Sequence, residues 1–333
     1  MNSQGGGIWR TLQLLAGGSL LATIFCLLAE TFWLFELFTH FRVQLLAILL
    51  VLFVVFAVMR KPLWAIALAA ACIVNGTWVR DYVLPVGRTV ADAALTSDTA
   101  EQRPATTTGT GESLPAELRI LLSNVLASNP DAGALMSVVQ AVEPDIVAVL
   151  ELTPAFASDL ESLHAQFPDR ILQPQAGRFG LGVYSRVPVL EQTLLDLSGY
   201  VGIDARVELD GTQWHFVAVH LVPPVSGAMA QLRNTQLTVL AGHLDSLNAP
   251  YIVAGDFNLT PWSPYFSRFT EATGTRSALQ GFGPGYTWPS YFPPLGIPID
   301  HVLISDQFTV SDYFRATDIG SDHFPIVADI NRR

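Results

Sequence analysis

The sequence has little charge and few cysteines for its length. Only 14% of its 333 residues are charged, whereas a typical globular domain carries about 25%. Half of the residues are hydrophobic, and the mean hydropathy is +0.38. So apolar a composition excludes a disordered chain. Two cysteines in the whole chain exclude a scaffold held together by disulfides.

The charge that is present is unevenly distributed. Residues 1–87 contain five of the 18 basic and three of the 29 acidic side chains, which leaves residues 88–333 with a net charge of −13. Domains that bind duplex DNA are usually basic, because neutralising phosphates supplies much of their affinity. We therefore expect no stable duplex DNA partner for the second part of the chain.

Three long apolar runs lie near the N-terminus, at about 12–28, 43–59 and 62–79. They are close to the minimum length that crosses a hydrocarbon core of ~30 Å, and none has a formal charge inside it. A buried helical bundle is the alternative, but three runs so close together leave too little polar surface to cover them in water. Residues 1–87 are therefore predicted to be a membrane anchor with three transmembrane helices.

The basic residues around these runs predict their orientation. Arg10 precedes the first run and Arg60–Lys61 fill the turn between the second and third, whereas the loop 29–42 has one arginine against Glu30 and Glu36. By the positive-inside rule the N-terminus then lies in the cytoplasm, although two arginines after the third run oppose this bias. Three spans would place the rest of the chain outside.

Residues 88–116 are rich in Ala, Thr, Ser and Gly without apolar periodicity, which predicts a flexible linker. From residue 117 the pattern changes. The apolar runs 118–125 and 145–150 enclose a helical segment, with Asn129 as its N-cap and Pro130 as its first residue, and together predict a β-α-β unit. Asp210–Gly211, between runs 205–209 and 212–219, predicts a hairpin.

The remaining runs complete an α/β pattern. A long amphipathic helix is predicted at 228–247, and further strands at 179–185, 251–254, 302–305, 310–314 and 325–330. Some successive strands are connected through helices and others by hairpins. This mixture predicts two mixed β-sheets packed face to face with flanking helices, a four-layer α/β sandwich.

Polar residues occur where the predicted strands begin or end, the position of the active site in open α/β folds. A carboxylate beside an apolar strand is costly to bury unless it is paired or binds a cation. Oxygen ligands suit Mg²⁺ or Mn²⁺, and without a Cys–His cluster zinc is not favoured. The candidate residues are Asn124, Glu151, His220, Asp256, Asn258, Asp300, Asp322 and His323.

Each candidate alone has a simpler explanation, and only the position of all of them at successive strand ends argues for a common site. His301 follows Asp300 and would point to the opposite face of a strand, so we expect it to be structural. Two aromatic segments, 262–266 and 288–292, could line a substrate groove, touch lipid, or pack within loops. The simpler explanations are a turn (Asn124, Ser321–His323), a cap for the turn that follows (Glu151), a βα turn (Gly255–Asn258) and a hydrogen-bonded core histidine (His220).

Seven short motifs follow one another along the second part of the chain. In this order, over about 118–331, they resemble the endonuclease/exonuclease/phosphatase (DNase I-like) superfamily, in particular bacterial membrane-anchored members of it. The glutamine that usually precedes the Ala-Leu-Glu motif is absent here. The motifs are SNV (123–125), VAVLE (147–151), GVYSR (182–186), VHLVP (219–223), GDFN (255–258), PIDHVL (298–303) and GSDHFPI (320–326).

The resemblance implies a catalytic domain over 117–333 that, with the anchor, would lie on the outer side of a bacterial inner membrane. It also implies a divalent cation, Mg²⁺ or Mn²⁺, that polarises a phosphoryl oxygen. The residues implied to hold this cation are Asn124, Glu151 and Asp322.

The resemblance further implies five catalytic residues. Asp256 would orient or deprotonate the attacking water, and Asn258 would donate to the phosphoryl group. His323, oriented by Asp300, would contact the phosphate. His220 would be the second phosphate-binding histidine and a possible proton donor to the leaving group. Whether His323 or Asp256 is the base stays open at this point.

The predicted function is that of a membrane-tethered, divalent-metal-dependent phosphoesterase. It would hydrolyse a phosphodiester or a phosphomonoester by in-line attack of water, with a lipid headgroup, a nucleotide or a nucleic acid as substrate. The alternatives are an extracytoplasmic nuclease and a non-catalytic sensor or scaffold that keeps the fold. The sequence does not predict an oligomeric state.

Overall fold

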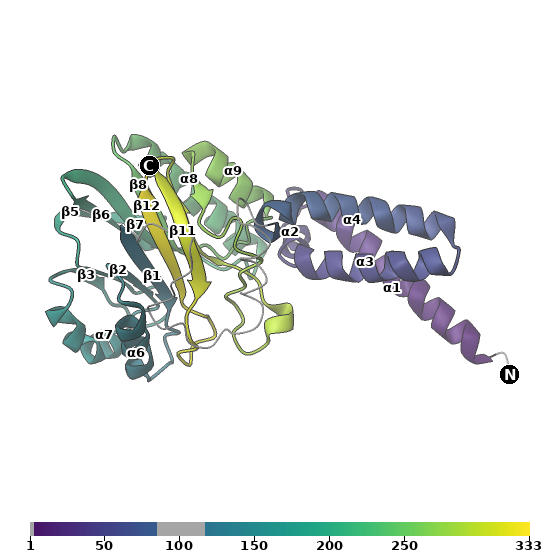
Figure 1. Ribbon diagram of the computed structural model, residues 1–333, viewed down its shortest axis with the longest axis horizontal. Coiled ribbons are helices and arrows are strands. Elements are labelled where there is room, and N and C mark those ends of the chain that lie inside the picture. Colours follow the sequence, from purple (N-terminus) through teal and green to yellow (C-terminus); the bar gives the residue numbers. More distant parts are fainter. Residues whose placement is uncertain (1–2, 85–116) are drawn as a thin grey trace, which may run out of the picture.

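The computed structural model describes residues 3–84 and 117–333 (Figure 1). The predicted linker at 88–116 lies outside the described residues. The first described range forms a group of helices, and the second forms two sheets with helices on their outer faces (Figure 1).

All three predicted apolar runs form helices. They lie in α1 (Ser3–Leu27), α3 (Arg42–Val58) and α4 (Pro62–Val83), and α3 and α4 form an antiparallel pair (Figure 1). By length and composition, the stretches Gly7–Leu27 and Pro62–Val83 could cross a membrane. The middle run lies in a helix of 17 residues, at the lower limit of span length, and it counts as a third candidate span together with the preceding helix, from which it is bent by 67°.

The segment between the first two runs is not an open loop. It contains the short helix α2 (Trp33–Thr39), which packs on α8 (Gly227–Ser246) of the second part. Glu36 of α2 is 1% exposed and pairs with the buried Arg233 of α8 at 2.7 Å. The first described range is therefore attached to the sandwich by a buried ion pair.

The sandwich contains two mixed six-stranded sheets, as predicted. Each sheet has one parallel pair, β1 with β2 and β7 with β8, and its other pairs are antiparallel. The first sheet has the order β11-β12-β1-β2-β4-β3, with β1 Leu118–Asn124, β2 Ile146–Leu150, β3 Asp169–Gln173, β4 Leu181–Ser185, β11 Phe308–Arg315 and β12 Ile326–Arg332. The second has the order β5-β6-β7-β8-β10-β9, with β5 Val189–Asp196, β6 Val201–Leu209, β7 Thr212–His220, β8 Tyr251–Asp256, β9 Arg276–Ser277 and β10 Asp300–Ile304.

Three apolar cores separate four layers. Alternate residues of the strands, such as Ile120 of β1 and Phe216 of β7, fill the core between the two sheets. The helices α6 (Ala132–Val142) and α7 (Pro154–Asp159) cover the outer face of the first sheet, and α8 and α9 (Pro264–Thr273) cover that of the second. Two short 3-10 helices, η1 (Glu161–Ala165) and η2 (Pro293–Leu295), lie in loops. The predicted four-layer α/β sandwich is confirmed.

Of two local predictions, the hairpin turn is confirmed and the helix N-cap is not. Asp210 and Gly211 both have positive φ, at 49° and 74°, and close the predicted hairpin between β6 and β7. The predicted N-cap of α6 is wrong. Asp131 caps the helix by accepting from the Ala134 N–H at 3.1 Å, whereas Asn129 instead donates to the Ile319 carbonyl at 2.9 Å.

Candidate functional site

The candidate residues meet because the strands that carry them end at the same side of both sheets. The parallel strands β1 and β2 end side by side, with Asn124 opposite Leu150, so Glu151 follows at the same edge. In the second sheet, His220 of β7 lies opposite Asp256 of β8. Asp300 opens the antiparallel strand β10 opposite Asp256, which brings it to the same edge.

Asp256, Asp300 and His323 form the compact centre of this site. Each is buried, and each offers a ligand atom within 4.8 Å of the other two. His323 Nδ1 lies 2.8 Å from Asp300 Oδ2, and His323 Nε2 lies 3.9 Å from Asp256 Oδ2. One ring nitrogen of His323 is thus occupied by Asp300, while the other faces Asp256.

Asn124 lies between the two sheets. Its Nδ2 is 3.4 Å from Glu151 Oε1 and 3.5 Å from both Asp256 Oδ2 and His323 Nε2. Its Oδ1 accepts from the Leu126 N–H at 3.1 Å. The amide therefore turns its nitrogen toward the site in this structure, and it would bind a cation only through the oxygen that Leu126 engages.

The other two predicted metal ligands are held by different contacts. Glu151 Oε2 accepts from the Ala127 N–H at 2.8 Å, which leaves Oε1 directed at Asn124. Asp322 Oδ2 accepts from the Trp288 indole at 3.1 Å, and its Oδ1 is buried without a hydrogen-bond partner in the described ranges. Within those ranges, the compact group formed by Asp256, Asp300 and His323 includes neither carboxylate.

His220 and Asn258 flank Asp256 on the second sheet. His220 Nε2 is 3.5 Å from Asp256 Oδ2, and its ring packs on Phe179 with centroids 5.1 Å apart. The Asn258 N–H donates to Asp256 Oδ1 at 2.8 Å, but its Nδ2 donates to the Leu221 carbonyl at 2.9 Å. Asn258 thus orients the Asp256 carboxylate, and one of its amide hydrogens is already used within the protein.

His301 lies on the other face of β10, as expected. Its Nε2 is 2.8 Å from the Leu259 carbonyl, and its ring packs against Phe257 and Phe266 in the core beneath α9. Burial lowers its pKa to about 4, so this imidazole is neutral at physiological pH.

Mutual proximity changes the titration of the central group. Burial would raise the pKa of Asp256, but the hydrogen bond from His220 and the charge of His323 lower it below its usual value. Burial would lower the pKa of His323, but the charge of Asp300 and their hydrogen bond raise it to about 9. Burial raises the pKa of Asp300, against the charge of His323. The site therefore favours an imidazolium beside an ionised Asp256.

Two hydroxyl groups that sequence reasoning missed hold this group in place. Ser321 Oγ donates to the Asn124 carbonyl at 2.7 Å and accepts from the His323 N–H at 3.1 Å, which joins the histidine to β1. Thr287 Oγ1 accepts from the Asp300 N–H at 3.3 Å. Ser321 belongs to the segment Ser321–His323, for which the sequence offers a turn as the simpler explanation, whereas no sequence signal marks Thr287.

The donor set fits a hard divalent cation. Carboxylate oxygens dominate it, and Asp300 Oδ1 and Asp322 Oδ1 are buried without a hydrogen-bond partner in the described part of the chain. A buried carboxylate oxygen without a donor is unfavourable unless a cation or a water compensates it. The oxygen atoms of Glu151, Asp322 and Asn124 are ligands of the kind that Mg²⁺ or Mn²⁺ prefers.

A family comparison agrees with this geometry. The model of the endonuclease/exonuclease/phosphatase family matches residues 121–323, from within β1 to His323. The chain belongs to this family. The match covers every candidate residue and excludes the N-terminal helices.

Solved structures of the family share its fold. D. rerio TDP2 in complex with a single-stranded DNA product has 21% identity and a TM-score of 0.56, covering 64% of this chain and 98% of that one. The human Nocturnin catalytic domain with bound sulfate has 19% identity and a TM-score of 0.56, covering 66% and 94%. A mannosyl-6-phosphatase of Bacteroides thetaiotaomicron has 16% identity and a TM-score of 0.50, covering 64% and 99%. A search of curated proteins gives no match.

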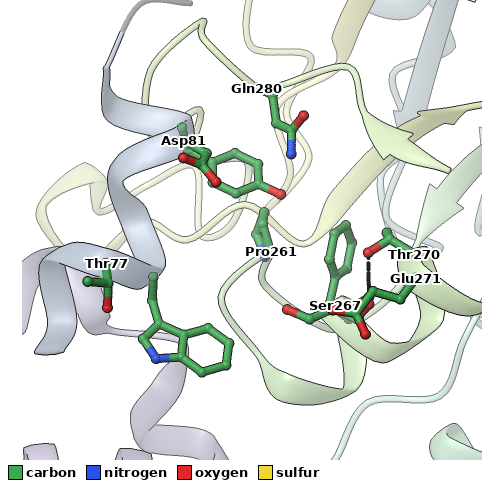
Figure 2. Close-up of a pocket in the computed structure, with 10 residues that line it drawn as sticks. Thr77, Asp81, Pro261, Ser267, Thr270, Glu271 and Gln280 are labelled. Carbon is green, nitrogen blue, oxygen red and sulfur yellow. Dashed lines mark hydrogen bonds between the residues drawn. The ribbon is translucent and has the colours of Figure 1, made fainter. Parts of the chain in front are cut away.

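A separate cavity of about 270 Å³ lies where α4 meets α9 (Figure 2). None of the eight candidate residues lines it. Its walls are Thr77, Trp78, Asp81, Tyr82, Pro261, Phe266, Ser267, Thr270, Glu271 and Gln280, so it belongs to the junction between the N-terminal helices and the sandwich.

Proposed function

We propose that this protein is a membrane-tethered, divalent-metal-dependent phosphoesterase that hydrolyses a phosphate ester by in-line attack of water. One observation carries the proposal: Asp256, Asp300 and His323 converge from three different segments within 4.8 Å of one another in a buried site. Membership of the endonuclease/exonuclease/phosphatase family supports the reaction class.

The protein's own residues supply binding and proton transfer. His323 Nε2 would hold the phosphate, since its other nitrogen is fixed by Asp300 at 2.8 Å. Asp256 is ionised at neutral pH because its pKa is lowered, so it can orient the attacking water and accept its proton, whereas the raised pKa of His323 keeps that imidazole protonated. This favours Asp256 over His323 as the base. His220 lies 3.5 Å from Asp256 and would donate to the leaving oxygen.

A divalent cation would be held by Glu151, with Asn124 or Asp322 as further oxygen ligands. When bound, it would neutralise charge that builds on the phosphoryl oxygens. Glu151 is suited to this role because the Ala127 N–H fixes one of its oxygens and leaves the other toward the site.

Membrane tethering is supported by the N-terminal helices. Two of them are long and apolar enough to cross a bilayer, and the bent pair formed by α2 and α3 offers a third span. With three spans and the basic turn at Arg60–Lys61 in the cytoplasm, the sandwich would lie outside the cytoplasm. A bacterial inner membrane is the location that we propose.

The substrate class has two candidates. The names of the structural neighbours include a complex with a single-stranded DNA product and a sugar phosphatase. A nucleic acid is thus one candidate, as substrate of an extracytoplasmic nuclease. The membrane anchor favours the other, a phosphate ester at the membrane surface.

The test uses the full chain in detergent with bis-p-nitrophenyl phosphate and Mg²⁺ or Mn²⁺. We expect metal-dependent release of nitrophenol that chelation abolishes and added metal restores. Glu151→Gln, Asp256→Asn and His323→Ala should each reduce kcat by about 10²-fold or more, because each removes a positioned ligand, base or donor.

His301→Gln is the matched control, since it alters a buried histidine on the opposite face of the same strand and can keep the bond to the Leu259 carbonyl. Its kcat should stay close to that of the unaltered chain. Full activity in the three site variants would refute the proposed chemistry. Metal binding without hydrolysis would favour a non-catalytic sensor.

A further inference from the structure

An exposed apolar segment borders the candidate site. Tyr291 is 76% exposed, Phe292 48% and Leu295 50%, with Pro293 and Pro294 between them. Large apolar side chains gathered in so short a segment are unfavourable in water and mark a contact surface. We name residues 290–296 the rim loop.

One end of the rim loop is fastened to the candidate site. The Ser290 N–H donates to the Asp322 carbonyl at 2.8 Å, and Ser290 Oγ donates to the Ser321 carbonyl at 2.7 Å. Both acceptors immediately precede His323 in the chain. The start of the rim loop therefore lies beside the phosphate-binding histidine.

The other end is fastened to the N-terminal helices. Gln44 lies in the first turn of α3, and its Nε2 donates to the Gly296 carbonyl at 2.8 Å. Gly296 approaches Tyr286 so closely that a Cβ atom there would lie 2.6 Å from the ring. The loop is thus held between the site and the start of α3, with its tip facing outward.

The length of α3 places this junction at a membrane surface. Its 17 residues span roughly 26 Å, less than the ~30 Å of a hydrocarbon core. The preceding helix α2 is bent by 67° from α3 and is paired with α8 of the sandwich through Glu36 and Arg233, so it stays outside the hydrocarbon. If α3 crosses the membrane beside α4, its whole length is then needed, and its first turn lies at the boundary between headgroups and hydrocarbon. The hydrogen bond from Gln44 sets the rim loop at the same depth.

The composition of the loop suits that depth. Residues 286–299 contain no charged side chain, and the tip combines tyrosine, phenylalanine, proline and leucine. Aromatic rings favour the membrane–water interface, where an apolar body and a polar edge are both satisfied. The neighbouring helix α2 and the residue before it also expose Phe32, Leu34 and Phe38.

We propose that the rim loop rests in the headgroup layer of the membrane that holds the anchor, and that the site therefore acts on a phosphate ester carried by a membrane lipid. The inference rests on the proposed function and adds its substrate class. A bilayer is the only occupant proposed for this surface, because the loop is joined to the helix that would enter that bilayer.

The first test measures contact with lipid. The full chain is placed in nanodiscs of phosphatidylethanolamine and phosphatidylglycerol with brominated acyl chains, and Phe292→Trp adds a fluorophore to the tip. We expect the added emission to be quenched relative to nanodiscs with unbrominated lipid. Leu194→Trp is the control, because Leu194 is 49% exposed on β5, at the end of the sandwich far from α3 and α4 (Figure 1). Its emission should not be quenched.

The second test separates a lipid substrate from a soluble one. Tyr291→Ser with Phe292→Ser should lower turnover of nanodisc phospholipid by about tenfold or more, because two aromatic side chains leave the interface. Hydrolysis of bis-p-nitrophenyl phosphate should be unchanged. Leu190→Ser with Leu194→Ser, an exposed apolar pair on β5, should change neither reaction.

The outcomes distinguish this inference from the proposed function. Unquenched emission from the Phe292→Trp variant, or turnover of single-stranded DNA and of the soluble ester but not of nanodisc phospholipid, would overturn the lipid inference and leave the phosphoesterase intact. An equal loss on both substrates in the loop variant would also overturn it, since the loop would then merely support the site. Failure to hydrolyse any ester would refute the proposed function itself.

Discussion

Asp300 and His323 show how burial and pairing set the chemistry of a single group. At 2.8 Å, the Asp300 carboxylate stabilises the imidazolium and keeps the ring in one orientation. The pKa of His323 rises to about 9 although burial opposes this change. The positive charge that His323 would present to a phosphate thus depends on Asp300, which would not contact the phosphate itself.

Asp300→Asn should therefore lower kcat by about 10²-fold or more. The amide keeps the shape but not the charge, so the pKa of His323 should fall toward its ordinary value. NMR titration of the His323 ring in both proteins would measure this fall directly. An unchanged His323 pKa would contradict the positioning role, whatever happens to the rate.

His301 makes a prediction about stability rather than activity. In the unfolded chain it titrates near pH 6.5, whereas in the folded protein burial lowers its pKa to about 4. As pH falls from 6.5 to 4, the unfolded state takes up a proton that the folded state does not, so stability is lost across this window. The loss approaches ~3 kcal/mol.

His301→Gln should remove this contribution. Urea unfolding of the full chain in detergent at pH 7 and pH 4.5 should show a smaller drop in midpoint for the variant than for the unaltered protein. Equal drops in the two proteins would mean that His301 does not titrate as its burial indicates.

At the scale of elements, the contact between α2 and α8 matters most. Glu36 and Arg233 are both buried, and Ser263 Oγ donates to the same carboxylate at 3.1 Å. Arg233 also lies 3.4 Å from the carbonyl of Asn258, next to the candidate site. The short helix α2, which lies outside the family-matched region, thus supplies the carboxylate that pairs with the buried Arg233 of the sandwich.

Glu36→Leu should destabilise the full chain by about 3–5 kcal/mol, because it leaves the Arg233 guanidinium buried without its partner. Combining it with Arg233→Met should restore much of the loss, since no unpaired charge then remains. Chemical denaturation in detergent would measure both. Glu30→Ala is the control. It removes an exposed pair with Arg268, which should cost no more than about 1 kcal/mol.

Elements also differ in how far the sequence predicted them. The strands β2 and β8 are short, mainly apolar runs that are almost wholly buried, and β1 and β7 are buried over most of their length; the sequence predicted all four. It missed β3 and β5, because both are edge strands without a long apolar run, and the side chains of β5 are mostly exposed. The predicted N-cap of α6 lies two residues before the observed one, because Asn129 and Asp131 are equally good caps. Only the contact of Asn129 with Ile319 decides between them.

For the whole molecule, the N-terminal helices and the sandwich are joined by more than a chain connection. The Gly281 and Gly283 N–H groups donate to the carbonyls of Asp81 and Tyr82 at the end of α4, at 3.1 and 2.9 Å. Trp262 is buried and donates to the His40 carbonyl at 3.0 Å. The aromatic segment 262–266 therefore packs at this junction.

The orientation of the whole molecule in a membrane is open to a direct test. Alkaline phosphatase fused after Arg333 should be active and a fluorescent protein at the same place should be dark, because the first folds only outside the cytoplasm. Fusions after Lys61 should give the reverse pattern, since the basic turn stays inside. A fluorescent C-terminal fusion would contradict the proposed placement.

The sequence by itself determined the family and the four-layer sandwich, and it predicted the eight polar candidates, because apolar periodicity and strand-end motifs are local patterns. Only the tertiary structure decided that Asn124 turns its amide nitrogen toward the site, that Asp322 bonds to Trp288, and that Glu36 joins the helices to α8. The contacts of the Asn124 nitrogen with Asp256 and His323, of Asp322 with Trp288 and of Glu36 with Arg233 join residues 34 to 199 positions apart. They depend on how the layers pack and in what register, which no local pattern encodes.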